Sequence, residues 1–400
     1  MLSISSPKIS VNGMKRYKCI DIVRGFAIIG MIFGHILNWW LTPEDYWLYL
    51  VIYYALGPVA AGGFLAISGL SASLSYKKSL VRIEESSDLN MRMVRNGYLL
   101  RGLLILIIAF LCNILIAIAI NDLTWIWAWF VLQTIGFSVI MSWPLLKTSK
   151  IFRLLFGSSI LIVNFIILEL LKPFQGQANL YGIMYHILFN PLELFPIIPF
   201  FTIFIFGTVL GDTLYEINII ENPNARLHAV KYKFIYPLFI IGPTLTIFAI
   251  VFQFPSFFTY SSFSAILYAI GIICIIVSVI IWIEELDLIK FKRNYNFFYY
   301  YSYYSFTVYI AHIPLFFLFY QRLNAINIWI AIFITLFLIT LLIRFIYKKL
   351  GPKASIKAGI GILSLVLTIK IEQRKNIKMG KFEVASNLGK LLKFRDEGKN

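Results

Sequence analysis

The first long apolar run of the chain carries four polar residues whose spacing places them on one face of a helix. Asp21, Arg24, His35 and Asn38 recur at intervals that bring them together at about 100° per residue. Ionisable residues inside such runs are costly to bury and therefore indicate function. A guanidinium can hold a phosphate with two hydrogen bonds, and an imidazole can act as a general base or carry an acyl group. The face suits a ligand with one charged end and one reactive end.

A structural interpretation of the same residues stays open. Asp21 and Arg24 can form an ion pair that reaches the membrane surface, and His35 can bond to a neighbouring helix. Along a helix, eleven residues separate Arg24 from His35, which corresponds to about 16 Å. In a membrane-spanning helix, Arg24 would lie near the cytoplasmic surface. His35 would lie in the outer half, with Asn38 one turn beyond it.

A second histidine, His312, lies in the late apolar segment SYYSFTVYIAHIPLFFLFY. It follows the start of its run at Phe297 by fifteen residues, and His35 follows Ile20 by the same number. The two histidines are therefore expected at one depth on different helices, with His312 as a second catalytic candidate. The alternative is a histidine bonded to a backbone carbonyl that Pro314 leaves free.

Further polar candidates lie outside these two runs. His186 and Glu193, in YGIMYHILFNPLELFPIIP, are expected to contact a polar substrate from outside the membrane, with a solvated loop pair as the alternative. Asp212 and His228 are interpreted as structural and solvated, respectively. The three cysteines are scattered, and neither CxxC nor HExxH occurs, so no metal site is predicted.

The elements that position these residues are long apolar runs. The chain of 400 residues is 60% hydrophobic, with a mean hydropathy of +0.80, whereas soluble domains are nearer to half apolar. Runs of about 20 apolar residues span a bilayer as helices, since lipid offers backbone polar groups no partner. The predicted fold class is all-α, a polytopic membrane helix bundle with about ten transmembrane helices. The spans are expected near 20–40, 48–75, 98–120, 125–146, 154–171, 195–214, 234–252, 261–283, 297–320 and 327–347.

The formal net charge of +17 follows the connections between the spans. Basic residues gather in alternate connections and in the C-terminal segment, whereas the opposite set carries only Lys172 and Arg322. By the positive-inside rule, both termini are cytoplasmic and the segment 172–194 is outside. We expect a multi-pass protein of the cell membrane with lipids as neighbours and no nucleic-acid partner. Residues 1–350 are expected to form the transmembrane domain, and 351–400 a basic cytoplasmic tail.

Several segments together resemble a known family. IDIVRGFAIIGMIFGH resembles the opening helix of the transmembrane acyltransferase superfamily, with ten residues between Arg24 and His35. GGFLAISGLSASLSYKK is similar to its second helix, and YSFTVYIAHIP to a late one. FVLQTIGFSVI and NPLELFPIIPFFTIFIFGTVLG resemble the narrower group similar to heparan-α-glucosaminide N-acetyltransferase, especially its prokaryotic members. The matches run from about Tyr17 to His312.

The resemblance implies transfer of an acyl group, acetyl first, from cytoplasmic acyl-CoA to an extracytoplasmic sugar or glycolipid. Arg24, with Asp21, would contact the acetyl-CoA or other acyl-CoA, and His35 would be catalytic. Asn38, His186 and Glu193 would bind the acceptor. The lysosomal members use a histidine in the first extracytoplasmic loop, and this chain has none between Asn38 and Gly62. That departure assigns the role to His35 and leaves the acceptor open.

Two other classes of function also fit buried polar residues on membrane helices. A transporter or lipid flippase without acyl transfer predicts inverted repeats and paired interrupted helices, and neither is detected. A non-catalytic membrane scaffold is the third class. The oligomeric state, the acyl chain length and the acceptor are not determined by the sequence.

Overall fold

The computed structural model describes residues 16–85, 89–189, 195–255, 262–285 and 295–374. Within these ranges the chain is almost entirely helical and forms no strand, apart from one isolated bridge between Leu41 and Leu323. The all-α prediction is therefore confirmed. The helices are α1 (Lys18–Trp40), α2 (Trp47–Glu85), α3 (Met91–Ile120), α4 (Val131–Leu145), α5 (Lys150–Leu171), α6 (Leu180–Leu188), α7 (Ile197–Asn218), α8 (Pro223–Val230), α9 (Tyr236–Phe252), α10 (Phe263–Glu285), α11 (Tyr295–Tyr303), α12 (Ser305–Ala311), α13 (Asn327–Leu350) and α14 (Ile356–Arg374).

The described part of the chain contains nine helical segments that are long and apolar enough to cross a membrane. The predicted late span, 297–320, is instead broken into α11, α12 and a 3-10 helix over Ile313–Phe317. Tyr304 leaves the helical conformation, with φ −95° and ψ 16°, and Pro314 prevents an ordinary α-helix from continuing past His312. The break places His312 at a turn between two short helices.

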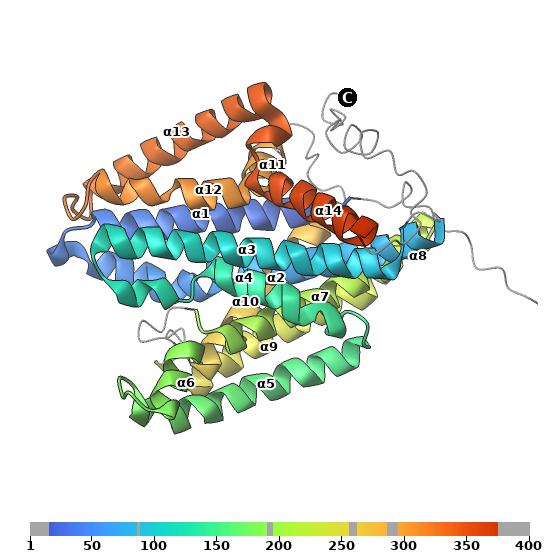
Figure 1. Ribbon diagram of the computed structural model, residues 1–400, viewed down its shortest axis with the longest axis horizontal. Helices are drawn as coiled ribbons and strands as arrows, with labels where there is room; N and C mark the ends of the chain where they lie inside the picture. The colour runs from blue at the N-terminus through green and yellow to red at the C-terminus, as the bar shows by residue number, and fades with distance from the viewer. Residues whose placement is uncertain (1–15, 86–88, 190–194, 256–261, 286–294, 375–400) are drawn as a thin grey trace, which may run out of the picture.

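The first helix lies inside the bundle, between α2 and the broken α11–α12 segment (Figure 1). Its start is fixed by α10, because the Glu284 carboxylate accepts hydrogen bonds from the backbone amides of Lys18 and Cys19 at 2.9 and 2.8 Å. A carboxylate at this position also compensates the positive end of the helix dipole. Gly25 allows α11 to approach, since an added Cβ there would lie 2.9 Å from the Phe298 carbonyl oxygen.

The second helix packs against α7 along a stripe of glycines. A Cβ added at Gly69, Gly207 or Gly211 would collide with backbone atoms of the opposite helix. Small residues at such positions let membrane helices approach closely, where dispersion contacts and interhelical hydrogen bonds supply the stability. The α2–α7 pair forms the centre of the larger apolar core, in which Leu65 and Phe204 are fully buried.

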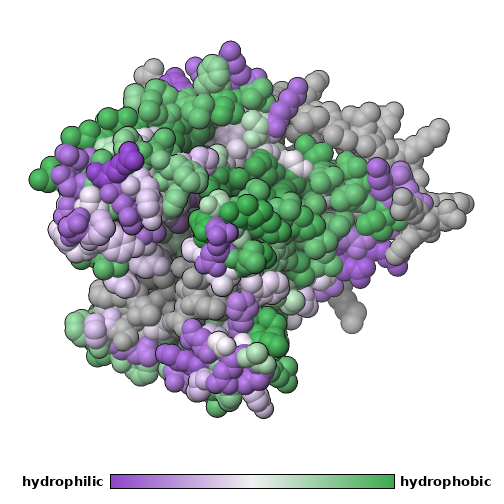
Figure 2. Space-filling view, turned by 60° about the vertical axis from the view of Figure 1, so that its left-hand side comes forward, coloured by the Kyte–Doolittle hydropathy of each residue, from purple (hydrophilic) through white to green (hydrophobic). Residues whose placement is uncertain are grey.

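Many apolar side chains are exposed on the outer surface of the bundle. Leu115 on α3, Leu155 on α5, Ile240 on α9 and Phe333 on α13 are each more than 60% exposed. Figure 2 shows a broad apolar surface on the side that it presents, with hydrophilic residues gathered around its margins. Because soluble proteins rarely expose large contiguous apolar patches, this surface fits contact with lipid.

The two ends of the bundle differ in charge. We call the end at which α1, α3 and α5 begin and α2 and α7 end the basic end, since it carries Arg16, Lys77, Arg82 and Lys150 (Figure 1, right). The opposite end, at which α1 ends and α2 begins, is called the far end. The predicted orientation places the basic end in the cytoplasm.

A cysteine introduced at Gln177 tests this orientation. Gln177 is exposed at the far end, between α5 and α6. We expect Gln177→Cys to react in intact cells with a membrane-impermeant thiol reagent, and Asn224→Cys, exposed at the basic end, to react only after lysis. Cys19 and Cys274 are buried, and the half-buried Cys112 is replaced by alanine in both variants, so the native background is low. Labelling of Asn224→Cys but not Gln177→Cys in intact cells would reverse the assignment.

The last described helix, α14, contains the apolar stretch 358–369 and packs against α3 (Figure 1). Ile360 lies in an apolar cluster with Ala109, Leu132 and Phe306. The preceding turn is fixed to α12, because the Thr307 hydroxyl donates to the Ala354 carbonyl oxygen at 3.2 Å and accepts from the Ile356 amide at 3.1 Å. The division into residues 1–350 and 351–400 stays a prediction. At least the first part of the second segment is packed on the bundle.

Candidate functional site

The two histidines singled out from the sequence meet in the structure. The His35 and His312 rings lie 5.0 Å apart between centroids, although they are far apart in the chain. Trp39, one turn beyond His35 on α1, stacks on both rings, at 4.8 Å from His35 and 5.5 Å from His312. His35 on α1 and His312 at the turn after α12 are therefore neighbours, and the indole packs against both imidazoles.

The two histidines have different surroundings. His312 is 5% exposed, and its Nδ1 donates to the carbonyl oxygen of Tyr309, one turn earlier. A carbonyl oxygen only accepts, so Nδ1 carries the hydrogen and Nε2 keeps a lone pair in the neutral ring. His35 is partly exposed and lines a cavity, and no hydrogen bond to it is found within the described residues. His35 is thus the histidine with access to a substrate, and His312 is the one held in a fixed orientation.

The cavity beside His35 lies between α1, α2, the start of α4 and α12. It has a volume of about 150 Å³ and is lined almost entirely by apolar side chains. On α1 it extends from Ala27 to His35, and Gly34 borders open space, since an added Cβ there would meet no atom within 4 Å. Tyr309, whose carbonyl orients His312, lines the same cavity. The reactive end of the proposed polar face therefore opens into a largely apolar space.

Asp21 and Arg24 form the other end of that face. The Arg24 guanidinium donates to the Ser302 hydroxyl at 3.1 Å and to the Ser71 hydroxyl at 2.6 Å, and it lies 3.8 Å from the Asp21 carboxylate. Asp21 also accepts from Ser302 at 2.7 Å and pairs with Arg16 at 2.8 Å. Both residues are less than 10% exposed. The network joins α1, α2 and α11, so it has a structural role whatever ligand it contacts.

A larger pocket opens at the basic end, between α2, α3, α11 and α14. Its volume is about 590 Å³, within the ~300–1,000 Å³ typical of sites for small molecules. Four cations line it, namely Arg16, Arg82, Arg101 and Lys357, and we call it the basic pocket. Arg101 and Lys357 were not predicted as site residues. The signal for Arg101 was visible, because it interrupts the apolar run from Leu99 to Ile120.

The predicted acceptor residues do not form one cluster. Asn38 lies at the far end of α1 and accepts a hydrogen bond of 2.6 Å from the Tyr46 hydroxyl. His186 is on α6, which packs against α5, and it is not among the described residues that line the cavity beside His35. Glu193 lies outside the described residues. Asn38 thus lies on α1 with His35, whereas His186 lies on a different helix, α6. In the part of the chain that the structure describes, no group of three acidic, cysteine or histidine residues could hold a metal.

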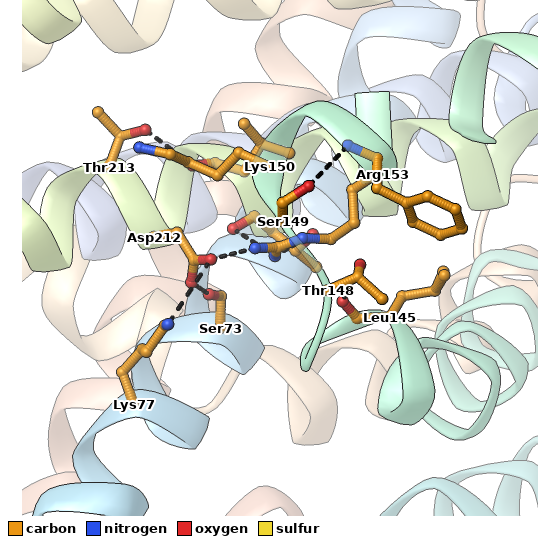
Figure 3. Close-up of polar contacts among 12 residues, drawn as sticks. Ser73, Lys77, Leu145, Thr148, Ser149, Lys150, Arg153, Asp212 and Thr213 are labelled. Atoms are coloured by element: carbon orange, nitrogen blue, oxygen red, sulfur yellow. Dashed lines mark hydrogen bonds and ion pairs between the residues drawn. The ribbon is translucent and has the colours of Figure 1, made fainter. Parts of the chain in front are cut away.

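A second buried charge cluster, away from the histidines, joins α2, α5 and α7 near the basic end (Figure 3). The fully buried Arg153 donates to the Asp212 carboxylate and, at 3.1 Å, to the Thr208 hydroxyl. Asp212 also accepts from the Ser73 hydroxyl, and Lys77 lies 4.0 Å away. Since every group here faces another helix, the structural interpretation of Asp212 fits this arrangement.

Breaking that cluster is expected to destabilise the fold strongly. Asp212→Asn leaves the buried Arg153 charge without its counter-ion, which costs about 3–5 kcal/mol in comparable buried pairs. The matched control is Lys150→Gln, which breaks the exposed Lys150–Glu216 pair on the same two helices, worth about 0–1 kcal/mol. Thermal unfolding in detergent should show a large fall of the midpoint for Asp212→Asn alone. Equal midpoints for the two variants would contradict the structural role.

The sequence of the chain was compared with models of known protein families. Residues 16–254 match the family described as heparan-alpha-glucosaminide N-acetyltransferase, catalytic, over more than half of the chain. The matched region contains Asp21, Arg24, His35 and Asn38, and it ends before His312 and α14. A search of curated proteins gave no match. The chain therefore belongs to the heparan-alpha-glucosaminide N-acetyltransferase catalytic-domain family, and its function is of the membrane acetyltransferase type.

Proposed function

We propose that the protein transfers an acyl group, acetyl first, from acyl-CoA bound at the basic end to an acceptor that reaches the histidine pair from the far end. The observation that carries the proposal is the meeting of His35 and His312 beside a cavity on the helix that also bears Arg24. With the predicted orientation, the donor comes from the cytoplasm and the acceptor from outside the cell membrane.

The spacing along α1 fits a donor with a long, extended arm. Eleven residues separate Arg24 from His35, which is about 16 Å of helix. The cavity begins at Ala27, one turn from Arg24, and reaches His35. A donor whose charged part stays at the basic end can therefore place a thioester at the histidines, with Arg24 and Asp21 beside its arm. Acetyl-CoA has this form, and a longer acyl-CoA shares it.

The chemistry at the histidines requires one base and one leaving group. Neutral His35 takes the proton from the acceptor's hydroxyl or amine, whose oxygen or nitrogen forms a bond to the thioester carbonyl carbon. The carbon–sulfur bond then breaks, and the CoA sulfur leaves with the electron pair and takes up a proton. His312, fixed by the Tyr309 carbonyl, positions His35 or the acceptor. The surrounding apolar walls exclude water, which would otherwise hydrolyse the thioester.

The acceptor is proposed to be a sugar or glycolipid. Asn38 lies at the far end of α1, one turn beyond His35, and its side chain can hydrogen-bond hydroxyl groups. His186 and Glu193 stay proposed as outer contacts on the segment that precedes α7. The absence of a histidine between Asn38 and Gly62 leaves the chemical class of the attacking group open between hydroxyl and amine.

Release of CoA thiol by the purified protein tests the proposal. With acetyl-CoA and a crude extracytoplasmic glycan and lipid fraction, we expect thiol release above that of a preparation lacking the protein. A transporter or flippase without acyl transfer would release none. Absence of acceptor-dependent thiol release with acetyl-CoA and with a longer acyl-CoA would reject the enzymatic function.

A further inference from the structure

The basic pocket brings together four cations, and Asp21 beside it is shared between Arg16 and Lys357. Arg82, Arg101 and Lys357 all line it and are exposed to it, and none of the three forms an ion pair there. No aspartate or glutamate is found among the described lining residues. Arg16, the fourth cation, is already paired with Asp21 at 2.8 Å. The cations still outnumber the acidic groups near them and repel each other, so an anion bound in the pocket would stabilise it.

The last helix completes this pocket. Lys357, Gly361, Ser364 and Thr368 line it from α14, opposite Arg101 on α3. Gly361 lets the Arg101 side chain lie against α14, since an added Cβ would come within 3.2 Å of a guanidinium nitrogen. Lys357 is repelled by Arg24, Arg101 and Arg16 and attracted by Asp21. All of α14 lies beyond residue 254, where the family match ends.

The pocket is connected to the start of the polar face on α1. A smaller cavity of about 260 Å³ shares Ser75, Ser79 and Arg82 with the basic pocket and is also lined by Ser71. The Ser71 hydroxyl accepts the 2.6 Å hydrogen bond from Arg24. The basic pocket therefore adjoins a cavity that reaches Ser71, the hydrogen-bond partner of Arg24.

We propose that the basic pocket binds the phosphates of the nucleotide end of acyl-CoA, with Arg82, Arg101 and Lys357 as ligands and α14 as the wall that carries Lys357. This assignment rests on the proposed function, because it makes the pocket the anchor of the same donor. Phosphate groups fit three clustered cations, and arginine binds them through two parallel hydrogen bonds. Tyr76 and Tyr98 also line the pocket, so aromatic side chains are near the place where the adenine would lie. The headgroup of an anionic phospholipid carries the same phosphate chemistry, so the test must distinguish these two sources.

Equilibrium binding of CoA to the full-length protein in nanodiscs of neutral phosphatidylcholine is the test. Lys357→Gln and Arg101→Gln are each expected to weaken CoA binding about tenfold, the scale of one charge-assisted hydrogen bond. Lys353→Gln is the matched control, since Lys353 is exposed just before α14 and does not line the pocket. Lys357→Arg, which keeps the charge, should retain most of the affinity. Adenosine 3′,5′-bisphosphate should compete with CoA, and pantetheine, which lacks phosphate, should not.

The outcomes separate this inference from the function on which it rests. Wild-type protein that binds no CoA would reject the proposed function itself. Wild-type protein that binds CoA while Lys357→Gln and Arg101→Gln bind it equally well would reject only the pocket. Loss of co-purifying phosphatidylglycerol from Lys357→Gln nanodiscs, with CoA affinity unchanged, would assign the pocket to a lipid headgroup and also overturn the inference. Unchanged thermal midpoints in all variants exclude misfolding as the cause of lost binding.

Discussion

Replacing His35 by alanine is expected to lower acyl transfer by about 10²–10⁴-fold and to leave acyl-CoA binding nearly intact. Loss of a general base has a cost of this size, because no other group then removes the acceptor's proton in the transition state. His35 lines the cavity, whereas Arg24 lies about three helical turns away on α1 and the basic pocket does not include His35. Thiol release with acceptor present measures the chemistry, and acyl-CoA binding without acceptor measures the donor site.

His228→Ala is the control for this substitution. His228 lies on α8, at the basic end, where it stacks on Tyr232 at 4.2 Å and contacts neither site. Its replacement should leave transfer unchanged. His312→Ala should be impaired but measurable, with a raised apparent KM for the acceptor, because His312 positions rather than reacts. If His312→Ala were inactive and His35→Ala active, the base would be His312, whose Nε2 lone pair is already set by the bond to Tyr309.

The second large effect is expected at Arg24. Arg24→Ala should weaken acyl-CoA binding by about 10–100-fold, the equivalent of one charge-assisted hydrogen bond of about 1.5–3 kcal/mol. It should slow the chemical step less, since the guanidinium lies far from His35. Arg24→Lys should restore binding only in part, because lysine offers a point charge instead of a planar fork. Binding measured with non-reacting CoA separates the affinity from the rate.

The structure supplies the control that the Arg24 prediction needs. Ser302 donates to Asp21 and accepts from Arg24, so Ser302→Ala disturbs the network and keeps both charges. If the network is only structural, Arg24→Ala and Ser302→Ala should lower the unfolding midpoint together and leave CoA affinity alike. If Arg24 contacts the donor, only Arg24→Ala should lose affinity well beyond the loss of stability. Unchanged acyl-CoA affinity in Arg24→Ala would remove Arg24 from the donor site.

The long apolar runs predicted the positions of the membrane helices, and the equal spacing of two histidines from the starts of their runs predicted the histidine pair. A membrane helix requires a long apolar run, so its position is visible without knowledge of its neighbours. Equal spacing of His35 and His312 from the starts of their runs predicted a shared depth, and the rings lie 5.0 Å apart. The break at Tyr304 was not predicted, because neither proline nor glycine marks that residue. Only Pro314, just after His312, gave a local signal.

Contacts between distant segments were the part that sequence patterns could not provide. Arg101 and Lys357 meet because α14 folds back against α3, and no periodicity within either helix records that contact. The stretch 358–369 was too short to span a membrane, so it gave no reason to place Lys357 in a site. The sequence placed His186 in a loop that faces the substrate. In the structure it lies on the short helix α6, which packs against α5, and it is not among the described residues that line the cavity beside His35.

Transfer of label from acetyl-CoA in inside-out membrane vesicles tests the central claim most directly. Acetyl-CoA labelled in the acetyl group would reach the basic end from the medium, and acceptors would be enclosed in the lumen. Vesicles containing the wild-type protein are predicted to accumulate label in an enclosed glycan or glycolipid fraction, and vesicles containing His35→Ala are predicted to accumulate none above background. Equal label in both kinds of vesicle, or no label above that of vesicles lacking the protein, would contradict acyl transfer at the histidine pair.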